Sequence, residues 1–213
     1  GPDVVGNSRL RALMAEARSE NMPKDNVEKA IKRALEKNQG DFKEVVFEGY
    51  GPHGIAYLVE TATDNNTRTV ANVRSYFTKC GGSLGTSGSV SFMFDHKCVF
   101  RIKYQEGMDI DELQLALCEC DDDPEVFIEE QEDKDENITK NVVIYGAYES
   151  YGAIQKYIED NGYELVSGGF ERIPNVELKD VTPEQRETLD KLTGLLEDDD
   201  DVTNVYSTLK PEE

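Results

Sequence analysis

The sequence predicts an α+β protein in which a helical hairpin precedes two α+β domains, and three observations lead to this fold class. The first 40 residues repeat apolar side chains at helical spacing, whereas later segments are rich in β-branched and aromatic residues. From residue 98 the expected order of elements is βαββαβ, which is typical of a ferredoxin-like fold. A last helix and strand then remain without a sheet of their own.

Two apolar stripes define the hairpin. The first comprises Leu10, Leu13, Met14 and Ala17, and the second comprises Val27, Ala30, Ile31, Ala34 and Leu35. The stretch SENMPKDN interrupts the pattern between them, and Pro23 is suited to the first turn of the second helix. We therefore expect two helices joined by a short turn.

The pattern changes to β after residue 41. The runs KEVVFEGYG (43–51) and GIAYLVETATD (54–64) predict two strands joined by the turn GYGPHG. Residues 64–80 predict a helix that Asn66 or Thr67 caps. The alternating run SVSFMF (89–94) predicts a further strand.

The second half supplies the βαββαβ series. Strands are expected at 98–104, 125–131, 141–148 and 163–173, and helices at 109–120 and 150–162. Asp109 and Ser150 are suited to cap the two helices, and Gly162 is suited to end the second. Thr182 to Gln185 then form a capping box with proline at the first helical position, followed by a leucine stripe and a strand at 201–209.

This last helix and strand are best explained if they complete the sheet begun at residue 42. The sequence therefore predicts three domains. They are an incomplete helical domain at 1–41, an α+β domain at 42–97 plus 175–213, and an inserted ferredoxin-like domain at 98–174.

The charge is distributed unevenly. The net charge is −21, yet residues 1–97 carry 13 Lys and Arg against 12 Asp and Glu, and the remaining residues carry 10 against 32. A polyanion could therefore approach only the first half, while the acidic half is a solvated surface or faces a protein partner. No apolar run approaches the roughly 18 residues of a membrane span, so we expect a cytoplasmic protein, or a mitochondrial one if a targeting leader precedes this sequence.

The residues offer no catalytic centre, metal site or cofactor motif. The four cysteines are irregularly spaced, and neither histidine belongs to a nucleophile, metal or relay pattern. The stretch from Asp133 imitates a calcium loop, but Ile138 and Ile144 stand where glycine and glutamate are needed. We therefore expect a protein that is not an enzyme and has no small-molecule substrate.

Four glycines, Gly81, Gly82, Gly85 and Gly88, lie in the stretch KCGGSLGTSGSVSFMF (79–94). They follow a helix and precede a strand, whereas phosphate-binding loops run from a strand into a helix. Gly81 or Gly82 is suited to end the helix, and Gly85 and Gly88 allow a close backbone approach. Whether that approach is to RNA or to the protein's own helices stays open.

In these motifs the chain resembles the YebC/PmpR-like family, which includes the mitochondrial translational activator of cytochrome c oxidase subunit one. The resemblance covers essentially all of the chain and is densest in NMPKDNVEKAIKRA (21–34) and in the stretch from Phe47 to Phe94. It implies three domains and a protein that acts as a DNA-binding transcriptional regulator or as a ribosome-associated translation factor. Family members usually begin with a strongly basic segment, which this sequence lacks, and Cys98 replaces a common glycine.

Taken together, the charge and the resemblance favour a non-enzymatic translation factor that binds ribosomal RNA through its first half. The residues expected to contact phosphate are Arg11, Arg18, Lys24, Lys32, Arg33, Arg68, Arg74 and Lys79, with backbone contacts from the four glycines. The alternatives are a DNA-binding transcriptional regulator and an acidic adaptor that binds only proteins. The sequence shows no helix-turn-helix signature, so its residues give little support to sequence-specific recognition of DNA.

Overall fold

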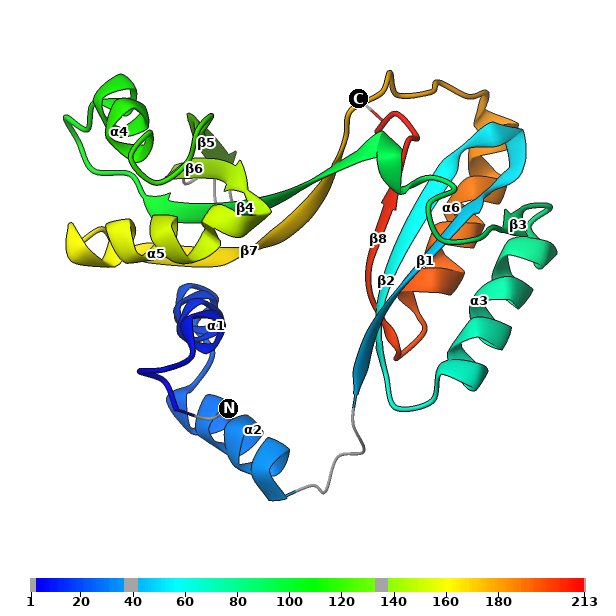
Figure 1. Ribbon diagram of the computed structural model, residues 1–213, viewed down its shortest axis with the longest axis horizontal. Coiled ribbons are helices and arrows are strands. Elements are labelled where there is room, and N and C mark those ends of the chain that lie inside the picture. The colour runs from blue at the N-terminus through cyan, green and yellow to red at the C-terminus, as the bar shows by residue number, and fades with distance from the viewer. Residues whose placement is uncertain (1–2, 37–41, 133–137, 213) are drawn as a thin grey trace. The chain divides into compact units, whose positions relative to one another are not determined.

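The computed structural model describes residues 3–36, 42–132 and 138–212. Its fold is α+β, as predicted, with two four-stranded antiparallel sheets (Figure 1). Contacts divide the chain into two compact units: unit 1 is 1–37 with 96–171, and unit 2 is 38–95 with 172–213. The finer division into three domains stays a prediction. None of the described helices is long and apolar enough to span a bilayer.

Unit 1 begins with the predicted hairpin of α1 (Ser8–Ser19) and α2 (Lys24–Glu36). Pro23 lies one residue before α2, not in its first turn, and its carbonyl oxygen accepts the amide hydrogen of Asn26 at 2.9 Å. A carbonyl that accepts the first helical bond belongs to the residue that flanks a helix. The expected position of Pro23 is therefore wrong by one residue.

The stripe predicted for α1 is also partly wrong. The side chain that α1 buries completely is Ala12, whereas Leu13 is exposed. Gly168 lies in the last strand of unit 1. A Cβ on Gly168 would lie 3.2 Å from the Cβ of Ala12, so α1 and this strand approach each other through two small residues. Helical spacing predicted the helix, but close packing of small residues selected its buried face.

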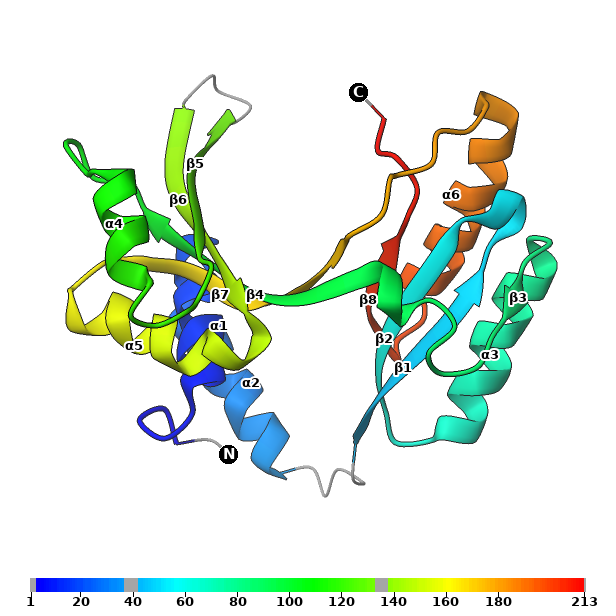
Figure 2. The ribbon, with the colours of Figure 1, turned by 45° about the horizontal axis from the view of Figure 1, so that its top comes forward.

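The sheet of unit 1 confirms the βαββαβ order. Its strands lie in the order β5 (Glu125–Glu132), β6 (Ile138–Ala147), β4 (Phe94–Lys103) and β7 (Leu165–Pro174). The helices α4 (Ile110–Leu117) and α5 (Tyr151–Asp160) contribute to one core with alternate residues of β4 and β6. Figure 2 shows β5 and β6 side by side, as their antiparallel pairing requires.

The ends of the helices in unit 1 test the predicted caps. Asp109 caps α4 by accepting the amide hydrogens of Asp111 and Glu112, and Gly162 follows α5 with φ at +70°, so both predictions are confirmed. Ser150 does not cap α5 with its side chain, because the backbone is already helical there. The short 3-10 turn Tyr148–Ser150 leads directly into the helix instead.

The sheet of unit 2 confirms that the last strand completes the first sheet. Its strands lie in the order β3 (Ser83–Leu84), β1 (Lys43–Tyr50), β2 (Ala56–Thr63) and β8 (Val202–Ser207), with the 3-10 turn Pro52–Gly54 between β1 and β2. The helices α3 (Asn66–Lys79) and α6 (Pro183–Glu197) pack against the same core, around Tyr57, Phe77 and Leu192. The capping box of Thr182 and Gln185 is present.

Two local predictions in unit 2 are wrong. The cap of α3 is Asn65, whose side chain accepts the amide hydrogen of Arg68 at 3.1 Å, and not Asn66 or Thr67. The run SVSFMF is not a strand, because Ser91–Met93 form a 3-10 turn and β4 begins only at Phe94. The amide hydrogens of Val90 and Ser91 bond to the carboxylate of Glu48, so they cannot join a strand ladder.

Candidate nucleic-acid interface

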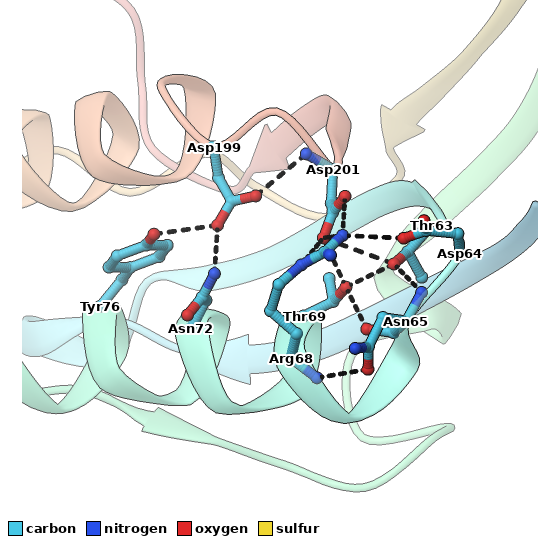
Figure 3. Close-up of polar contacts among 9 residues, drawn as sticks. All are labelled: Thr63, Asp64, Asn65, Arg68, Thr69, Asn72, Tyr76, Asp199 and Asp201. Carbon is cyan, nitrogen blue, oxygen red and sulfur yellow. Dashed lines mark hydrogen bonds and ion pairs between the residues drawn. The ribbon is translucent and has the colours of Figure 1, made fainter.

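The first turn of α3 is fixed to the turn between α6 and β8 by an ion pair (Figure 3). The Nη2 atom of Arg68 lies 2.8 Å from Oδ1 of Asp201, and its Nε atom lies 3.2 Å from Oδ2. Arg68 also donates to Asp64 at 3.0 Å. Asp201 is buried, whereas the side chain of Arg68 is half-exposed. This bidentate geometry makes Arg68 part of the scaffold of unit 2.

Two buried hydroxyl groups complete the surroundings of Asp201. Thr69 donates to Oδ2 of Asp201 at 2.7 Å, and Thr63 lies 3.4 Å from the same atom. Burial opposes ionisation of this carboxyl, but the hydrogen bonds from Arg68 and Thr69 outweigh it and hold the pKa of Asp201 below its usual value. The carboxylate is therefore kept ionised.

The next turn of α3 repeats the arrangement with a second carboxylate. Asn72 and Tyr76 both donate to Oδ2 of Asp199, at 3.1 and 2.9 Å. Burial and the adjacent carboxylate raise the pKa of Tyr76, so the phenol stays a donor. The groove beside Arg68 and Asn72 is lined otherwise by residues 198–201, all of them aspartates. Arg68, which the sequence placed among the expected phosphate contacts, therefore lies beside four aspartates.

The other predicted cations of α3 lie at its surface. Arg74 is exposed and forms no ion pair with any residue that the structure describes. The ammonium group of Lys79 lies 5.7 Å from the ring centre of Tyr76 and is likewise exposed. These two residues keep charge that a phosphate could contact. The role of Arg68 in such a contact stays a prediction.

The predicted cations of the hairpin lie in unit 1 and differ among themselves. Arg11 is held by Glu159 at 2.8 Å and by the carbonyl oxygen of Val5 at 2.7 Å. Arg18 is exposed and has no ion pair among the described residues. The Nζ atom of Lys24 lies 3.6 Å from Oε1 of Glu28, which is a long ion pair. Lys32 is exposed, and for Arg33 the structure describes the backbone alone. Among the predicted cations of the hairpin, Arg18 is thus the one that is most available.

The four glycines already use their amide hydrogens inside unit 2. Gly81 and Gly82 donate to carbonyl oxygens at the end of α3, and Gly85 donates to the carbonyl oxygen of Glu48. Gly81 has φ at +78° and ends the helix, as predicted. A Cβ on Gly82 would lie 2.5 Å from the carbonyl oxygen of Tyr50. The close approach to strand β1 of the protein itself is therefore made by Gly82, whereas at Gly88, one of the two glycines predicted to make such an approach, a Cβ would meet nothing within 4 Å.

Glu48 fixes the rest of this loop. Its carboxylate accepts the amide hydrogens of Gly88, Val90 and Ser91 at 2.8, 2.8 and 2.7 Å, and the residue is buried. Burial opposes ionisation, yet these backbone donors hold the pKa of Glu48 below its usual value. Neighbouring amide groups that converge in this way form an anion site, and here the protein's own carboxylate occupies it.

Sequence reasoning missed Glu48, Asp199 and Asp201. The signal for Glu48 was a carboxylate within a strand otherwise built from apolar and aromatic residues. The two aspartates lay in an acidic run, where the sequence does not distinguish a buried acceptor from solvated neighbours.

Glu48 and Asp201 make the stability of unit 2 depend on pH. Both carboxyls have a lowered pKa in the folded state, so their contribution is complete above the unfolded values of about 4 and is lost as the pH falls through the folded values. We expect the urea midpoint to fall between pH 5 and pH 3. The double variant Glu48→Gln/Asp201→Asn should show a shallower fall, and an equally steep fall would contradict this assignment.

No metal constellation is present in the part of the chain that the structure describes. No group of three or more His, Cys, Asp or Glu residues is placed to hold a metal ion there. The thiol of Cys98 is buried, which raises its pKa to about 11 and keeps it protonated at neutral pH. The calcium-loop imitation from Asp133 to Asn137 lies outside the described residues.

Two family models together match residues from both units of the chain. The model of the TACO1/YebC protein N-terminal domain matches residues 1–37, and the model of the TACO1/YebC second and third domain matches residues 42–209. A relative from Parabacteroides distasonis, named a probable transcriptional regulatory protein, is 55% identical over all of this chain and 83% of its own length. A relative of the same name from Flavobacterium johnsoniae is 52% identical over 100% of this chain and 84% of its own length.

A solved structure agrees with this result. The crystal structure of the conserved hypothetical protein Aq1575 from Aquifex aeolicus superposes with a TM-score of 0.71 at 32% identity, covering 100% of this chain and 84% of that one. The sequence matches and the shared fold extend over both sheets and the hairpin. These matches support a role as a regulatory protein and confirm the resemblance noted in the sequence. The chain belongs to the TACO1/YebC family.

Proposed function

We propose that this regulator is a non-enzymatic, cytoplasmic translation factor that contacts ribosomal RNA through exposed cations of the hairpin and α3. Its relatives are named probable transcriptional regulatory proteins, which supports a role in gene expression. The residues assigned to phosphate contact are Arg18, Arg74 and Lys79, and we assign Lys24 and Lys32 a weaker contribution. Such contacts position a protein on nucleic acid without reading its sequence.

One observation supports this choice of surface. Five cations between residues 97 and 156 each form an ion pair with a carboxylate of unit 1: Lys97, Arg101, Lys103, Lys140 and Lys156. Arg18 and Arg74, in contrast, have no such partner among the described residues. A neutralised cation attracts phosphate weakly, whereas an unpaired one releases counterions when it binds. The acidic surface then faces solvent or a protein partner.

We expect the triple variant Arg18→Ala/Arg74→Ala/Lys79→Ala to co-sediment poorly with ribosomes. Binding measured against ribosomal RNA fragments should also lose about two units of its slope in log K against log salt. The matched control is Lys103→Ala/Lys140→Ala/Lys156→Ala, which removes the same charge from residues that are already ion-paired. Equal losses in both variants would show that net charge alone governs binding.

The names of the relatives favour a second candidate, a DNA-binding transcriptional regulator. Gel shifts with genomic DNA fragments at 50 and 200 mM salt separate the two. Tight, sequence-dependent DNA binding that persists at the higher salt would overturn the ribosomal proposal. Binding to neither nucleic acid would leave the acidic protein adaptor.

A further inference from the structure

Tyr148 presents an aromatic ring at the surface of unit 1. It is the first residue of the 3-10 turn that leads into α5, and the residue is 45% exposed. The ring nevertheless stacks on His96, with the ring centroids 4.1 Å apart and the planes at 24°. A ring this exposed is usually free to rotate, whereas here a neighbour holds it in one orientation.

A third ring supports Tyr148 from the side. Phe170 lies 4.8 Å from Tyr148 and 5.8 Å from His96, so the directions from Tyr148 to its two neighbours are close to perpendicular. Since His96 covers one face of the tyrosine, Phe170 lies near its edge. The opposite face of Tyr148 is left without a ring neighbour among the described residues.

The support is continuous with the core. Phe170 lies 4.7 Å from Tyr151, which in turn lies 4.8 Å from the buried Phe100. The exposed ring is therefore the outer member of an aromatic series that begins inside the sheet. Such a series fixes the plane of Tyr148 before any ligand binds, which lowers the entropy cost of stacking.

A cation lies beside the same rings. The guanidinium carbon of Arg9 is 5.8 Å from the ring centre of Phe170, and Arg9 is exposed on α1 of the same unit. A flat exposed ring beside a cation matches the chemistry of a nucleotide, whose base stacks while its phosphate is attracted. Sequence reasoning singled out neither Arg9 nor Tyr148.

We propose that the open face of Tyr148 stacks an unpaired base of RNA and that Arg9 contacts the adjacent phosphate. This inference rests on the proposed RNA-binding function and names its substrate class. Bases within a duplex already stack on each other, so the site takes single strands, loops or bulges. Because every base has a π face, the site tolerates any sequence.

The chain contains no tryptophan, which allows a direct test. The variant Tyr148→Trp carries a single tryptophan, whose fluorescence should be quenched by a ten-nucleotide single-stranded RNA and not by the same sequence as a blunt duplex. Tyr148→Leu should weaken binding of the single strand by about 5- to 150-fold, and Tyr148→Phe should keep it. Arg9→Gln should weaken it and make it less dependent on salt.

The matched control is Phe127→Leu, which removes another half-exposed ring that stacks on a tyrosine, Tyr145, elsewhere in unit 1. Equal losses of RNA affinity in Tyr148→Leu and Phe127→Leu would overturn the stacking site. Tryptophan fluorescence that stays unquenched while anisotropy shows that RNA is bound would do the same. Either result would leave the proposed function unaffected. Failure of the unaltered protein to bind both RNA and ribosomes would overturn both. Quenching of Tyr148→Trp by an arginine-rich peptide, and not by RNA, would assign the ring to a protein partner.

Discussion

Replacing Asp201 by alanine is expected to lower the free energy of unfolding of unit 2 by about 3 kcal/mol, because hydrogen bonds to an ionised acceptor contribute about 1.5–3 kcal/mol each. The substitution removes an ionised acceptor that Arg68 and Thr69 reach at 2.8 and 2.7 Å. The buried hydroxyls of Thr63 and Thr69 then keep only each other, at 2.7 Å, and the carbonyl oxygen of Asn65, 3.0 Å from Thr69, as acceptors. Urea unfolding followed by circular dichroism measures the change.

The helix itself offers the control for this prediction. Arg68 and Arg74 are residues of one type on α3, but only Arg68 is paired with a buried carboxylate. Arg68→Ala should therefore destabilise strongly, because Asp201 would remain buried without its cation, whereas Arg74→Ala should change stability by less than about 0.5 kcal/mol. The double variant Arg68→Ala/Asp201→Ala should lose less than the sum of the single changes. Strict additivity would show that the pair is not coupled.

Replacing Glu48 by alanine is expected to lower the stability of unit 2 by about 3 kcal/mol and to release the glycine loop locally. Three amide hydrogens, those of Gly88, Val90 and Ser91, would lose one charged acceptor, and each such bond contributes about 1.5–3 kcal/mol before the loop relaxes toward water. Hydrogen exchange should speed up at these three amides first. The exchange of the core amides should follow global stability.

Glu44 supplies the matched control, since it is an exposed glutamate on the same strand. Glu44→Ala should leave the exchange of residues 88–91 unchanged. Glu48→Gln keeps the shape and one acceptor oxygen, so it should fall between the unaltered protein and Glu48→Ala. Unchanged protection at Val90 and Ser91 in Glu48→Ala would mean that the carboxylate does not hold the loop.

Much of the fold was predictable because its signals are local. The spacing of apolar residues predicted both helices of the hairpin, and the residue types at Asp109 and Thr182 predicted caps that are present. The pairing of the last strand was predictable by counting, since the strand at 202–207 needed a sheet and pairs with β2. The strand expected at 89–94 failed because Glu48, about forty residues earlier, takes the amide hydrogens that a ladder would need.

The candidate site was predictable only in part. The composition located the cations in the first half of the chain, but it could not say that Arg11 is held by Glu159, 148 residues away, while Arg18 has no ion pair among the described residues. Nor could it separate Arg68 from Arg74, which lie six positions apart on one helix. A charge is counted in the sequence, but its availability depends on what the fold places beside it.

The sequence by itself determined the α+β class, the order of the elements, the asymmetry of charge and the family. These are properties of periodicity, residue type and summed charge, which do not require distant residues to meet. Tertiary structure alone decided that a carboxylate occupies the glycine loop, that Asp201 neutralises Arg68, and that the exposed ring of Tyr148 stacks on His96. Each of these depends on residues distant in the chain, 133 positions apart for Arg68 and Asp201, whose contact only the folded backbone creates.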